Sequence, residues 1–404
     1  MKRDDLSHLV RQQLKRLPAP HEAHYGVVPL SPSEERIPLG PALNTHSEAT
    51  AALARVQTLA AELKDPYLIS RVLPRREAVS SSAIEGTNST LDELLSIEET
   101  GDGEAADAAV QVRDYALALD DLIPRARNEK QKIFTTAFIQ ELHRKVMRGD
   151  KEYKDTPGDL RSRVVWIGGR DIAYSTYNPT PPEDIARCLE DTMDYMRCEG
   201  MQAVQQDLIV RMAIAHSHFE AVHPFRDGNG RVGRLLLPLM MAAEDRIPLY
   251  LSPYIEAHKG RYYASLKAAQ QRLEWPAIIG FVSEAITGTV NELAATREAL
   301  QKLGGIWQAR RKFRAESAAI NALKILPHYP VLTVRRLANL LDISVPAATQ
   351  AVEQLVEASI LKERTGYKRN RVFSAHEALS IINRPFGEAP ILPDETSASA
   401  PADS

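Results

Sequence analysis

The chain has 404 residues, 44% of them hydrophobic, so it can bury a sizeable core and is expected to form two or three domains. Its net charge of -3 excludes a general attraction to nucleic acid or acidic membranes, and either kind of binding would need a local patch. No segment approaches the roughly 18 apolar residues of a membrane span, and the N-terminus lacks the apolar core of a signal peptide. Cys188 and Cys198 are predicted to be free thiols. We therefore expect a cytoplasmic protein without a membrane partner.

The first part of the chain is predicted to be an arm followed by helices. Residues 17–44 are rich in proline and show no periodicity, which indicates an extended arm on the surface. From Glu48, EATAALARVQTLAAELKD has the composition of a helix. Thr90 and Glu93 have capping-box spacing, so another helix is expected to begin there. Helical periodicity then recurs at about 105–125, 131–148, 182–197 and 205–222.

One segment departs from the helical pattern. RVVWIGGRDIAYSTY, residues 163–177, places β-branched and aromatic residues on both sides of a Gly-Gly pair. This arrangement predicts a β-hairpin in an otherwise helical protein.

A loop rich in polar residues and glycine separates two apolar stretches. AVHPFRDGNGRVGRLLLPLM, residues 221–240, follows a helix that Pro224 should end and precedes a second, buried helix. The N-terminus of a helix has unpaired N–H groups, and its macrodipole favours an anion. The sequence therefore predicts a phosphate site at this turn.

Beyond Leu300 the composition changes. IWQARRKFRAES is predicted to be a basic connector, followed by a short helix, a turn with Ser344 as N-cap, a longer helix and two strand-like pieces around RTGYKRNR. That order is typical of a winged helix-turn-helix. The last segment is rich in Pro, Ala, Ser and acid, which predicts disorder. The expected division is 1–105 for the arm and N-terminal helices, 106–300 for a core, 301–380 for the winged helix and 381–404 for the tail.

The motif HPFRDGNGR, followed by Arg234, resembles the signature of the Fic family at every defined position. TPGDLRSRVVWIGG is similar to the family's hairpin flap, LSPYIEAHKGRYYASL to its following helices, and EAVSSSAIEGT to the inhibitory helix of some members. The resemblance covers residues from about 20 to 300. It implies a mainly α fold, namely a Fic-type helical core with a β-hairpin flap, to which a C-terminal winged helix is often attached.

Fic proteins typically transfer AMP from ATP to a hydroxyl of a target protein, and the resemblance assigns roles in that reaction. His223 is the implied general base, since the reference pKa of histidine lies near neutrality. Asp227 is the implied Mg²⁺ ligand, and one carboxylate suffices because Mg²⁺ keeps waters and binds nucleotide phosphates. The expected partners are thus ATP, Mg²⁺ and a target with a Ser, Thr or Tyr hydroxyl, or the chain itself.

The rest of the loop is implied to hold the phosphates of ATP. Gly228 and Gly230 allow the backbone to approach them closely. By resemblance, Asn229 donates to the α-phosphate, while Arg231 and Arg234 bind the β- and γ-phosphates.

More distant residues complete the implied site. Tyr262 and Tyr263 are expected in the adenine pocket by resemblance. Ile167 and Gly168 are placed at the turn of the flap, whose edge can pair with an extended segment of the target.

Three further residues of the motif region are predicted to be structural. Phe225 is expected to anchor the loop in the core. His216 and His218 lie two positions apart on a helix and point to different sides, so a metal site shared with His223 is not favoured.

The stretch SSAIEG contains an implied switch. Ser81, Glu85 and Gly86 fit the family's inhibitory pattern, in which the glutamate pairs with the second arginine of the signature, here Arg234, and removes it from the γ-phosphate.

Two alternatives to a self-restrained protein adenylyltransferase stay open. One is a bifunctional or AMP-removing Fic enzyme in which Glu85 positions a water. The other is a DNA-binding regulator with a Fic sensor domain. In that case phosphates would be contacted by basic residues of the wing, namely Lys362, Arg364, Lys368, Arg369 and Arg371. Winged helices also bind proteins, and the resemblance makes a homodimer an expectation.

Overall fold

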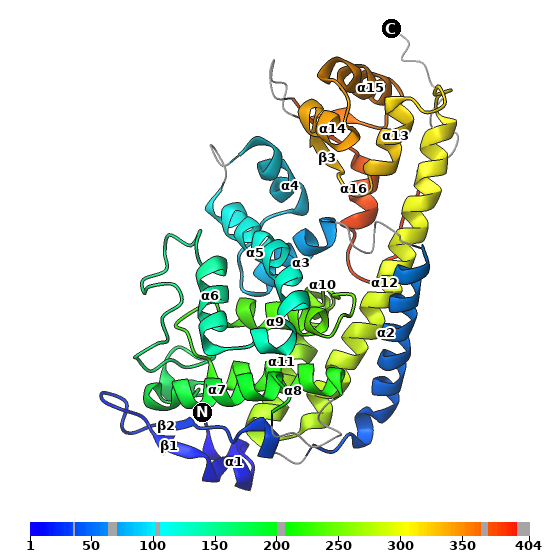
Figure 1. Cartoon of the computed structure of the whole chain (residues 1–404). Helices are drawn as coiled ribbons and strands as arrows, with labels where there is room; N and C mark the ends of the chain where they lie inside the picture. The colour runs from blue at the N-terminus through cyan, green and yellow to red at the C-terminus, as the bar shows by residue number, and fades with distance from the viewer. Residues whose placement is uncertain (35–36, 64–70, 102–105, 200–206, 365–370, 394–404) are drawn as a thin grey trace.

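The structure is a computed structural model that describes residues 1–34, 37–63, 71–101, 106–199, 207–364 and 371–393. The described chain is mainly helical, with small antiparallel sheets (Figure 1). The helices are α1 (His8–Gln12), α2 (Leu43–Leu63), α3 (Val72–Ile84), α4 (Leu91–Thr100), α5 (Asp107–Glu129), α6 (Thr136–Val146), α7 (Ile185–Met196), α8 (Leu208–Val222), α9 (Asn229–Ala243), α10 (Ser252–Ala257), α11 (Lys259–Arg272), α12 (Trp275–Ala309), α13 (Ala318–Ile325), α14 (Val334–Leu341), α15 (Val345–Glu357) and α16 (His376–Ile382). The strands are β1 (Leu14–Arg16), β2 (Tyr25–Val27), β3 (Val331–Thr333), β4 (Lys362–Glu363) and β5 (Val372–Ser374).

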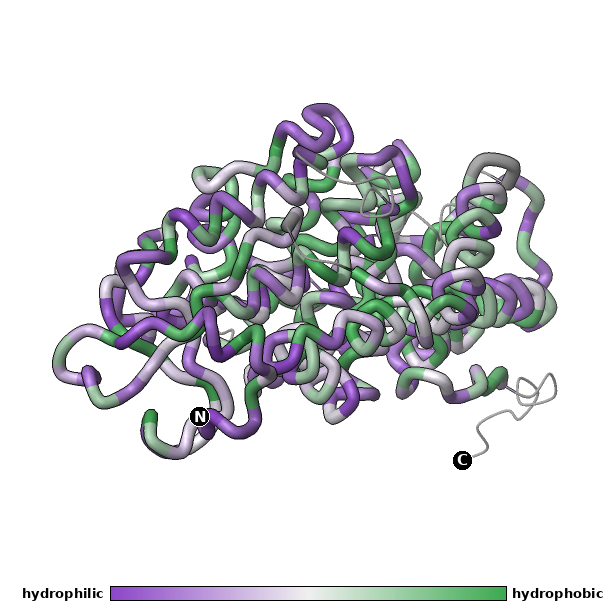
Figure 2. The backbone as a smooth tube through the Cα atoms, turned by 90° about the horizontal axis from the view of Figure 1, so that it is seen from below, coloured by the Kyte–Doolittle hydropathy of each residue, from purple (hydrophilic) through white to green (hydrophobic). Residues whose placement is uncertain are grey.

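Helices α8 and α9 form the centre of the core. Every residue of α8 is buried, as is every residue of α9 except Gly230. Helix α8 packs against α7 and α12, and α9 packs against α5. Figure 2 shows hydrophobic stretches concentrated in the interior of the molecule. A helix that is apolar on all sides is expected to be buried. The burial of both helices therefore confirms the predicted pair of apolar helices on the two sides of the polar loop.

The N-terminal segment differs from the expected extended arm. Strand β1 pairs with β2 in antiparallel register, with Leu14 opposite Val27. The N–H of Val27 also donates to the carbonyl of Asn178, 3.0 Å away, which ties this sheet to the core. Three-residue strands are too short to show an alternating pattern, so the sequence did not reveal them.

Of the helices before and after the SSAIEG stretch, one begins earlier than the sequence indicated and the other begins where it indicated. Helix α2 begins at Leu43, before the expected Glu48. The capping box at α4 is confirmed, because Thr90 Oγ1 accepts from the Glu93 N–H at 3.1 Å and the Thr90 N–H donates to Glu93 Oε2 at 2.9 Å.

The predicted hairpin at 163–177 is reduced to one antiparallel bridge between Ile167 and Tyr177. The chain does reverse at the Gly-Gly pair, where Gly168 has a φ of +69° and Gly169 a φ of +78°. A short 3-10 turn, capped by the side chain of Asp171, takes the place of the returning strand. The expectation of two paired strands is therefore wrong, because a local side-chain cap competes with the ladder.

The composition change at Leu300 falls inside a helix. Helix α12 continues to Ala309, so the first part of the expected connector is helical. Trp307 is fully buried and donates from Nε1 to Glu377 Oε2 at 2.7 Å. The C-terminal module, described for residues 318–364 and 371–382, is thus attached to a long helix (Figure 1).

This C-terminal module has its elements in the order expected of a winged helix-turn-helix. Strands β3, β5 and β4 form an antiparallel sheet in that order. Ser344 caps α15 as predicted, with its Oγ 3.4 Å from the Ala347 N–H. Residues 365–370 of the expected wing and 394–404 of the expected tail lie outside the described residues.

The expected disorder from 381 onward is wrong for the first residues of that segment. Residues Ile381 and Ile382 complete α16. Arg384 is buried and donates to Thr296 Oγ1 of α12 at 2.8 Å, so this part of the chain is bound to the core.

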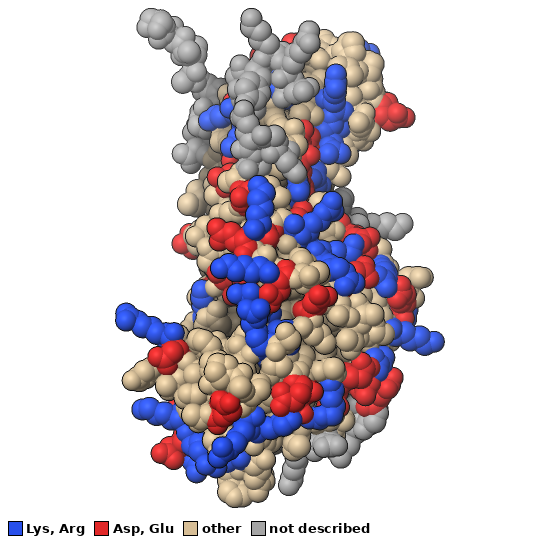
Figure 3. All heavy atoms as spheres, turned by 90° about the vertical axis from the view of Figure 1, so that its left-hand side faces the viewer, with Lys and Arg blue, Asp and Glu red and all other residues tan. Residues whose placement is uncertain are grey.

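The distribution of charged side chains on the surface agrees with the small net charge of the chain. On the face at the left of Figure 1, basic and acidic side chains are interspersed (Figure 3). None of the helices in the described part of the chain combines the length and the apolar composition that a membrane span requires.

Candidate active site

The polar loop is held by two left-handed residues. His223, which ends α8, has a φ of 51°, and Gly228, which precedes α9, has a φ of 78°. A Cβ at Gly228 would lie 2.7 Å from Met147 Sδ, so both the backbone angle and the space require glycine. The loop therefore turns tightly into the N-terminus of α9.

Asn229 fastens the loop from within. Its Oδ1 accepts from the N–H of Phe225 and its Nδ2 donates to the carbonyl of Phe225, each at 2.9 Å. Phe225 is fully buried, and its ring stacks on His143 with 3.8 Å between the ring centres. The anchoring role expected of Phe225 agrees with this geometry. Asn229 was expected to donate to a phosphate, whereas in this structure its amide is turned toward the loop backbone.

Two residues outside the signature position the loop, and sequence reasoning missed their roles. His143 of α6 accepts from the Gly158 N–H at Nδ1, 2.7 Å, which leaves Nε2 to donate to the Asp227 carbonyl at 3.0 Å. Burial lowers the pKa of His143 to about 4, so the ring is neutral. Its apolar-periodic place in α6 signals only that it is buried.

Arg161 is the second missed residue. Its Nε donates to the carbonyl of His223 at 2.8 Å, and its Nη2 donates to the carbonyl of Thr180 at 2.6 Å. Burial lowers the pKa of Arg161 to about 10. The guanidinium thus satisfies the carbonyls at the C-terminal end of α8, where a cation is also favoured by the helix dipole.

A cavity of about 480 Å³ lies beside the loop. It brings together residues from the loop, α3, the flap and α11. Its wall includes the following predicted residues: Glu85, Ile167, Gly168, His223, Gly230, Arg234, Tyr262 and Tyr263. Its volume is in the range of small-molecule sites.

Inside this cavity Glu85 is bound to Arg234. The Glu85 Oε1 lies 2.7 Å from Nη2 of Arg234. The Nε and Nη2 of Arg234 also donate to the Oγ and the carbonyl of Ser81, each at 2.9 Å. A Cβ on Gly230 would overlap with Oε1 of Glu85, so the carboxylate lies directly against the first turn of α9. An acidic side chain thus occupies the anion-favouring helix end.

The end of α3 fixes the place of Glu85. Gly86 has a φ of +88°, its N–H donates to the carbonyl of Ala83, and the N–H of Thr87 donates to the carbonyl of Ser82, both at 3.0 Å. These two bonds form a Schellman motif, which explains the glycine that follows Glu85.

The electrostatics keep this pair charged and His223 neutral. Burial opposes ionisation of Glu85, but the charge and hydrogen bond of Arg234 lower its pKa. Burial likewise opposes the charge on Arg234, yet Glu85 raises the pKa of that guanidinium. Burial, together with the charge of Arg161, lowers the pKa of His223 to about 4. A neutral imidazole is available as a base at physiological pH.

Four of the predicted phosphate or metal ligands, Asp227, Gly228, Asn229 and Arg231, are not on the wall of this cavity. Arg231 is buried, with Nη2 3.1 Å from Met147 Sδ and 3.8 Å from Asp150 Oδ2. Asp227 is exposed and lines a neighbouring polar cavity of about 480 Å³, which Gly86 also borders. The end of α3 therefore borders both cavities.

The fit of Asp227 to Mg²⁺ follows from its donor atoms. Its Oδ1 accepts from the Gly228 N–H at 2.6 Å, and the carboxylate faces solvent at the start of α9. The described residues contain no cluster of three or more side chains that could hold a metal ion. One exposed carboxylate fits Mg²⁺ provided that waters and phosphate oxygens supply the other ligands.

Tyr262 and Tyr263 differ in exposure. Tyr262 is buried, and its hydroxyl lies 2.7 Å from His216 Nε2. Tyr263 is 44% exposed and lies on the same cavity. The other nitrogen of His216 lies 3.1 Å from the carbonyl of Gly233. His216 therefore supports the wall from behind.

His218 points elsewhere, as its spacing from His216 predicted. Its Nδ1 lies 2.8 Å from Thr192 Oγ1, and its Nε2 lies 3.1 Å from the carbonyl of Leu30. Burial lowers the pKa of His218 to about 4.

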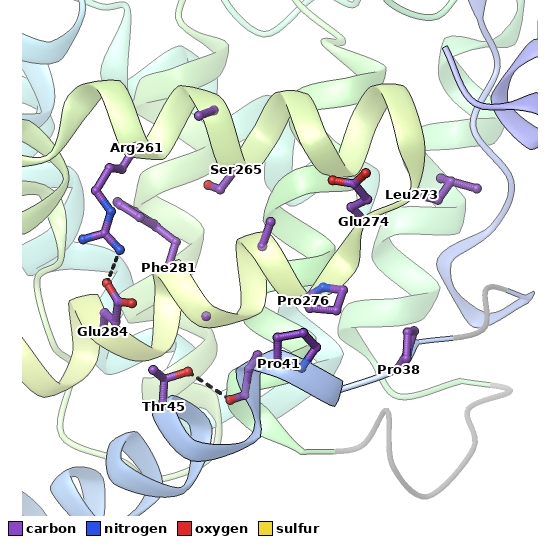
Figure 4. A pocket seen from close by; sticks show the side chains of 14 residues that line it. Pro38, Pro41, Thr45, Arg261, Ser265, Leu273, Glu274, Pro276, Phe281 and Glu284 are labelled. Carbon is purple, nitrogen blue, oxygen red and sulfur yellow. Dashed lines mark hydrogen bonds and ion pairs between the residues drawn. The ribbon is translucent and has the colours of Figure 1, made fainter. Parts of the chain in front are cut away.

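A larger hollow of about 800 Å³ lies between the start of α2, α11 and α12 (Figure 4). Arg261 and Glu284 pair at one end, and prolines and Phe281 line much of the rest. It contains none of the residues predicted for the site.

Two of the three described basic residues that were predicted to contact DNA form ion pairs, and Lys362 forms none with any described residue. Arg364 pairs with Asp92 of α4 and donates to Ser96 Oγ at 2.9 Å. Arg371 pairs with Glu363. Lys368 and Arg369 lie outside the described residues. The two arginines in the described part of the wing therefore contact α4 and strand β4.

Two family descriptions match the chain. Residues 43–121 match the Fic/DOC family N-terminal domain, and residues 133–241 match the Fic/DOC family domain. The first match contains the SSAIEG stretch and the second contains the loop. Residues 43–121 and 133–241 are therefore the two Fic/DOC domains of this chain.

Several similar proteins are named for an enzymatic activity. Protein adenylyltransferase fic-1 of Caenorhabditis briggsae is 33% identical over 190 residues, 46% of this chain and 35% of that protein. Protein adenylyltransferase Fic of Drosophila willistoni is 28% identical over 233 residues, 57% of this chain and 41% of that protein. The match thus spans less than half the length of these relatives. A solved Fic family protein from Desulfovibrio desulfuricans G20, at 19% identity, has a TM-score of 0.54 and covers 86% of this chain and 98% of its own, which shows the fold.

Proposed function

We propose that this chain is a protein adenylyltransferase that transfers AMP from ATP to a hydroxyl side chain of a target protein and that Glu85 restrains it. The observation that carries the proposal is one cavity in which a neutral His223, the N-terminus of α9 and Arg234 meet, with Glu85 bound to Arg234 at 2.7 Å. A histidine beside an anion-binding helix end is the combination that phosphoryl-group transfer to a hydroxyl needs.

In this reaction His223 takes the proton of the target hydroxyl. The hydroxyl oxygen then bonds to the α-phosphorus as the bond to the pyrophosphate oxygen breaks, and pyrophosphate leaves. The N–H groups at the start of α9 and the guanidinium of Arg234 stabilise negative charge on the phosphates. Asp227 is the residue that would hold Mg²⁺, which would neutralise phosphate charge when bound. Ile167 and Gly168, at the flap, would face the target.

Restraint follows from competition for Arg234. Its guanidinium is fully buried, and within the described chain it contacts Ser81 and Glu85. A γ-phosphate that approaches Arg234 must displace the Glu85 carboxylate, since both need the same nitrogen and the same helix end. Without displacement, the triphosphate binds out of line and the α-phosphorus is not presented to the hydroxyl.

The test is incubation with ATP labelled at the α-phosphate. We expect little protein labelling by the native chain, strong labelling by Glu85→Gly, and none by Glu85→Gly with His223→Ala. Calorimetric titration with ATP and Mg²⁺ serves as the control that the double variant still binds nucleotide. Label that persists without His223, or equal labelling with and without Glu85, would contradict the proposal.

A second candidate is removal of AMP, with Glu85 positioning a water. The observation in its favour is that the Glu85 side chain remains 35% exposed on the cavity although it pairs with Arg234. Release of label from a previously modified target, lost in Glu85→Gly, would support this activity.

A further inference from the structure

A buried glutamate, Glu220, lies behind His223 and has no role in the reaction described above. It is on the last turn of α8, three residues before His223, and both side chains border the same cavity. Glu220 Oε2 lies 3.9 Å from His223 Nδ1. The Glu220 side chain is 9% exposed and the His223 side chain 20%.

Each of the two groups has one buried polar atom without a partner in the described part of the chain, although the Glu220 oxygen nearest to His223 is Oε2 and the unsatisfied oxygen is Oε1. Within the described residues, Oε1 of Glu220 and Nδ1 of His223 are buried without a hydrogen-bond partner. A buried polar atom without a partner costs free energy, so such an atom calls for a functional explanation. Since Nδ1 is the buried ring nitrogen, Nε2 is the nitrogen that is left for the cavity.

A second buried glutamate shows what a structural carboxylate looks like in this protein. Glu77 of α3 accepts from the N–H of Ser252 at 2.8 Å, from its Oγ at 2.6 Å, and from the Tyr115 hydroxyl at 3.3 Å. Glu77 is therefore fully bonded, whereas Oε1 of Glu220 has no hydrogen-bond partner among the described residues. A Cβ on Gly233 would lie 2.5 Å from Oε1 of Glu220, so the glycine provides the space for this carboxylate.

We propose, on the basis of the function proposed above, that Glu220 is a positioning residue for His223. Its carboxylate accepts from Nδ1–H and so keeps Nε2 free of a proton and directed at the target hydroxyl. When Nε2 takes the hydroxyl proton as the oxygen bonds to the α-phosphorus and pyrophosphate leaves, the carboxylate faces the resulting imidazolium. The contact of 3.9 Å must shorten by about 1 Å, as hydrogen bonds of unliganded sites commonly do.

The charged state of Glu220 is linked to the inhibitory contact. The groups that face it are His223 on its own helix, Arg234 on α9, Glu85 at the end of α3, and Tyr262 and Tyr263 on α11. Burial raises the pKa of Glu220 to about 8, Arg234 lowers it and Glu85 raises it further. A protonated Glu220 cannot accept from Nδ1–H. Departure of Glu85 lowers the pKa of Glu220 and so favours the carboxylate that the base needs.

The kinetic test uses Glu85→Gly as the parent, because that variant is expected to be active. Addition of Glu220→Gln should lower kcat for target labelling by about 10- to 100-fold, with KM for ATP changed by less than about twofold. The rise of kcat of the parent from about pH 6 to about pH 9 should disappear in Glu220→Gln and persist in Glu220→Asp, which keeps a carboxylate. A matched control is Glu292→Gln on α12, a buried glutamate paired with Arg76 and Arg384 away from this cavity.

A spectroscopic measurement separates this inference from the proposed function. The tautomer of His223 can be read from ¹⁵N chemical shifts in the Glu85→Gly chain at about pH 9, without substrate or turnover. We expect the Nδ1–H tautomer in the parent and its loss in Glu220→Gln. An unchanged tautomer, or equal kcat and pH profiles, would overturn the role of Glu220 even if the parent transfers AMP. A parent that shows the expected tautomers but no AMP transfer would contradict the proposed function alone.

Discussion

The carboxylate of Glu85 lies 2.7 Å from the guanidinium of Arg234, although the two residues are 149 positions apart in the chain. The pair joins the end of α3 to the second turn of α9, and the carboxylate also covers the first turn. A substrate phosphate would need both of these places. One contact therefore couples the position of α3 to the availability of the proposed phosphate site.

The glycine after Glu85 offers a test of that coupling that leaves every charged group in place. Gly86 has a φ of +88°, and a Cβ added there would have no neighbour within 4 Å. Gly86→Ala should therefore act through backbone strain alone, at about 1 kcal/mol. This energy corresponds to about a fivefold increase in the population in which Glu85 is released, so the basal rate of AMP transfer should rise by about that factor.

Gly304→Ala is the matched control for this prediction. Gly304 lies within α12 and also has open space around its Cβ position. That variant should gain helix stability and leave AMP transfer unchanged. If Gly86→Ala transfers AMP no faster than the native chain, the cap of α3 does not hold the inhibitory contact.

The second prediction concerns Asn229 and is measured without nucleotide. Asn229→Ala removes the donor and the acceptor that satisfy the buried backbone of Phe225, so we expect a loss of about 2 kcal/mol in the free energy of unfolding. Asn229→Asp keeps the acceptor for the Phe225 N–H and should be destabilised less. Urea denaturation of both variants in the absence of ATP measures the difference. Equal stability of Asn229→Ala and the native chain would mean that the residue acts through a ligand and not through the loop.

The sequence predicted those parts of the site that depend on neighbours in the chain. The loop from His223 to Arg234 follows from two apolar helices with glycine and proline between them, and the structure has both helices. The capping box at Thr90 and the cap at Ser344 are equally local. The pairing of Glu85 with Arg234 came from the family resemblance, since no local pattern reports a contact between such distant residues.

The other features of the site depend on tertiary contacts. His143 and Arg161 hold the loop through bonds to its backbone, and no spacing in the sequence identifies which carbonyl a buried side chain will reach. The flap was expected to be a hairpin because Ile167 and its neighbours favour strands, yet Asp171 caps a turn instead. Glu220 was read as one residue of an apolar-periodic helix, and only its unsatisfied carboxylate beside His223 sets it apart.

The third prediction is a dependence of stability on pH. His218 is fully buried, and burial lowers its pKa from 6.5 to about 4, so the unfolded chain binds a proton that the folded chain rejects between these values. The stability that neutral His218 contributes is complete above about pH 6.5 and is lost as the pH falls toward about 4. Between about pH 7 and about pH 5 the native chain should lose about 2 kcal/mol more than His218→Gln.

Urea denaturation at each pH measures this difference, and the comparison cancels the titration of distant groups such as Glu77. Parallel curves of unfolding free energy against pH for the two chains would show that His218 binds its proton equally well in the folded and the unfolded protein, and would contradict the prediction.

The last prediction addresses the C-terminal module as a DNA-binding unit. Phosphate binding needs free cations, but of the three described cations of the wing only Lys362 has no ion pair within the described chain, since Arg364 is paired with Asp92 and Arg371 with Glu363. The helix that would enter the major groove, α15, carries the exposed Glu353, which repels phosphates, and Glu357, which is paired with Arg311. We therefore expect no shift of a mixed-sequence DNA duplex on a gel at about 150 mM salt and at most weak binding at about 50 mM. Replacement of Glu353 and Glu357 by glutamine should strengthen any binding at low salt. Tight binding by the native chain, with a steep loss of affinity as salt is raised, would contradict this prediction. It would show that the module binds DNA.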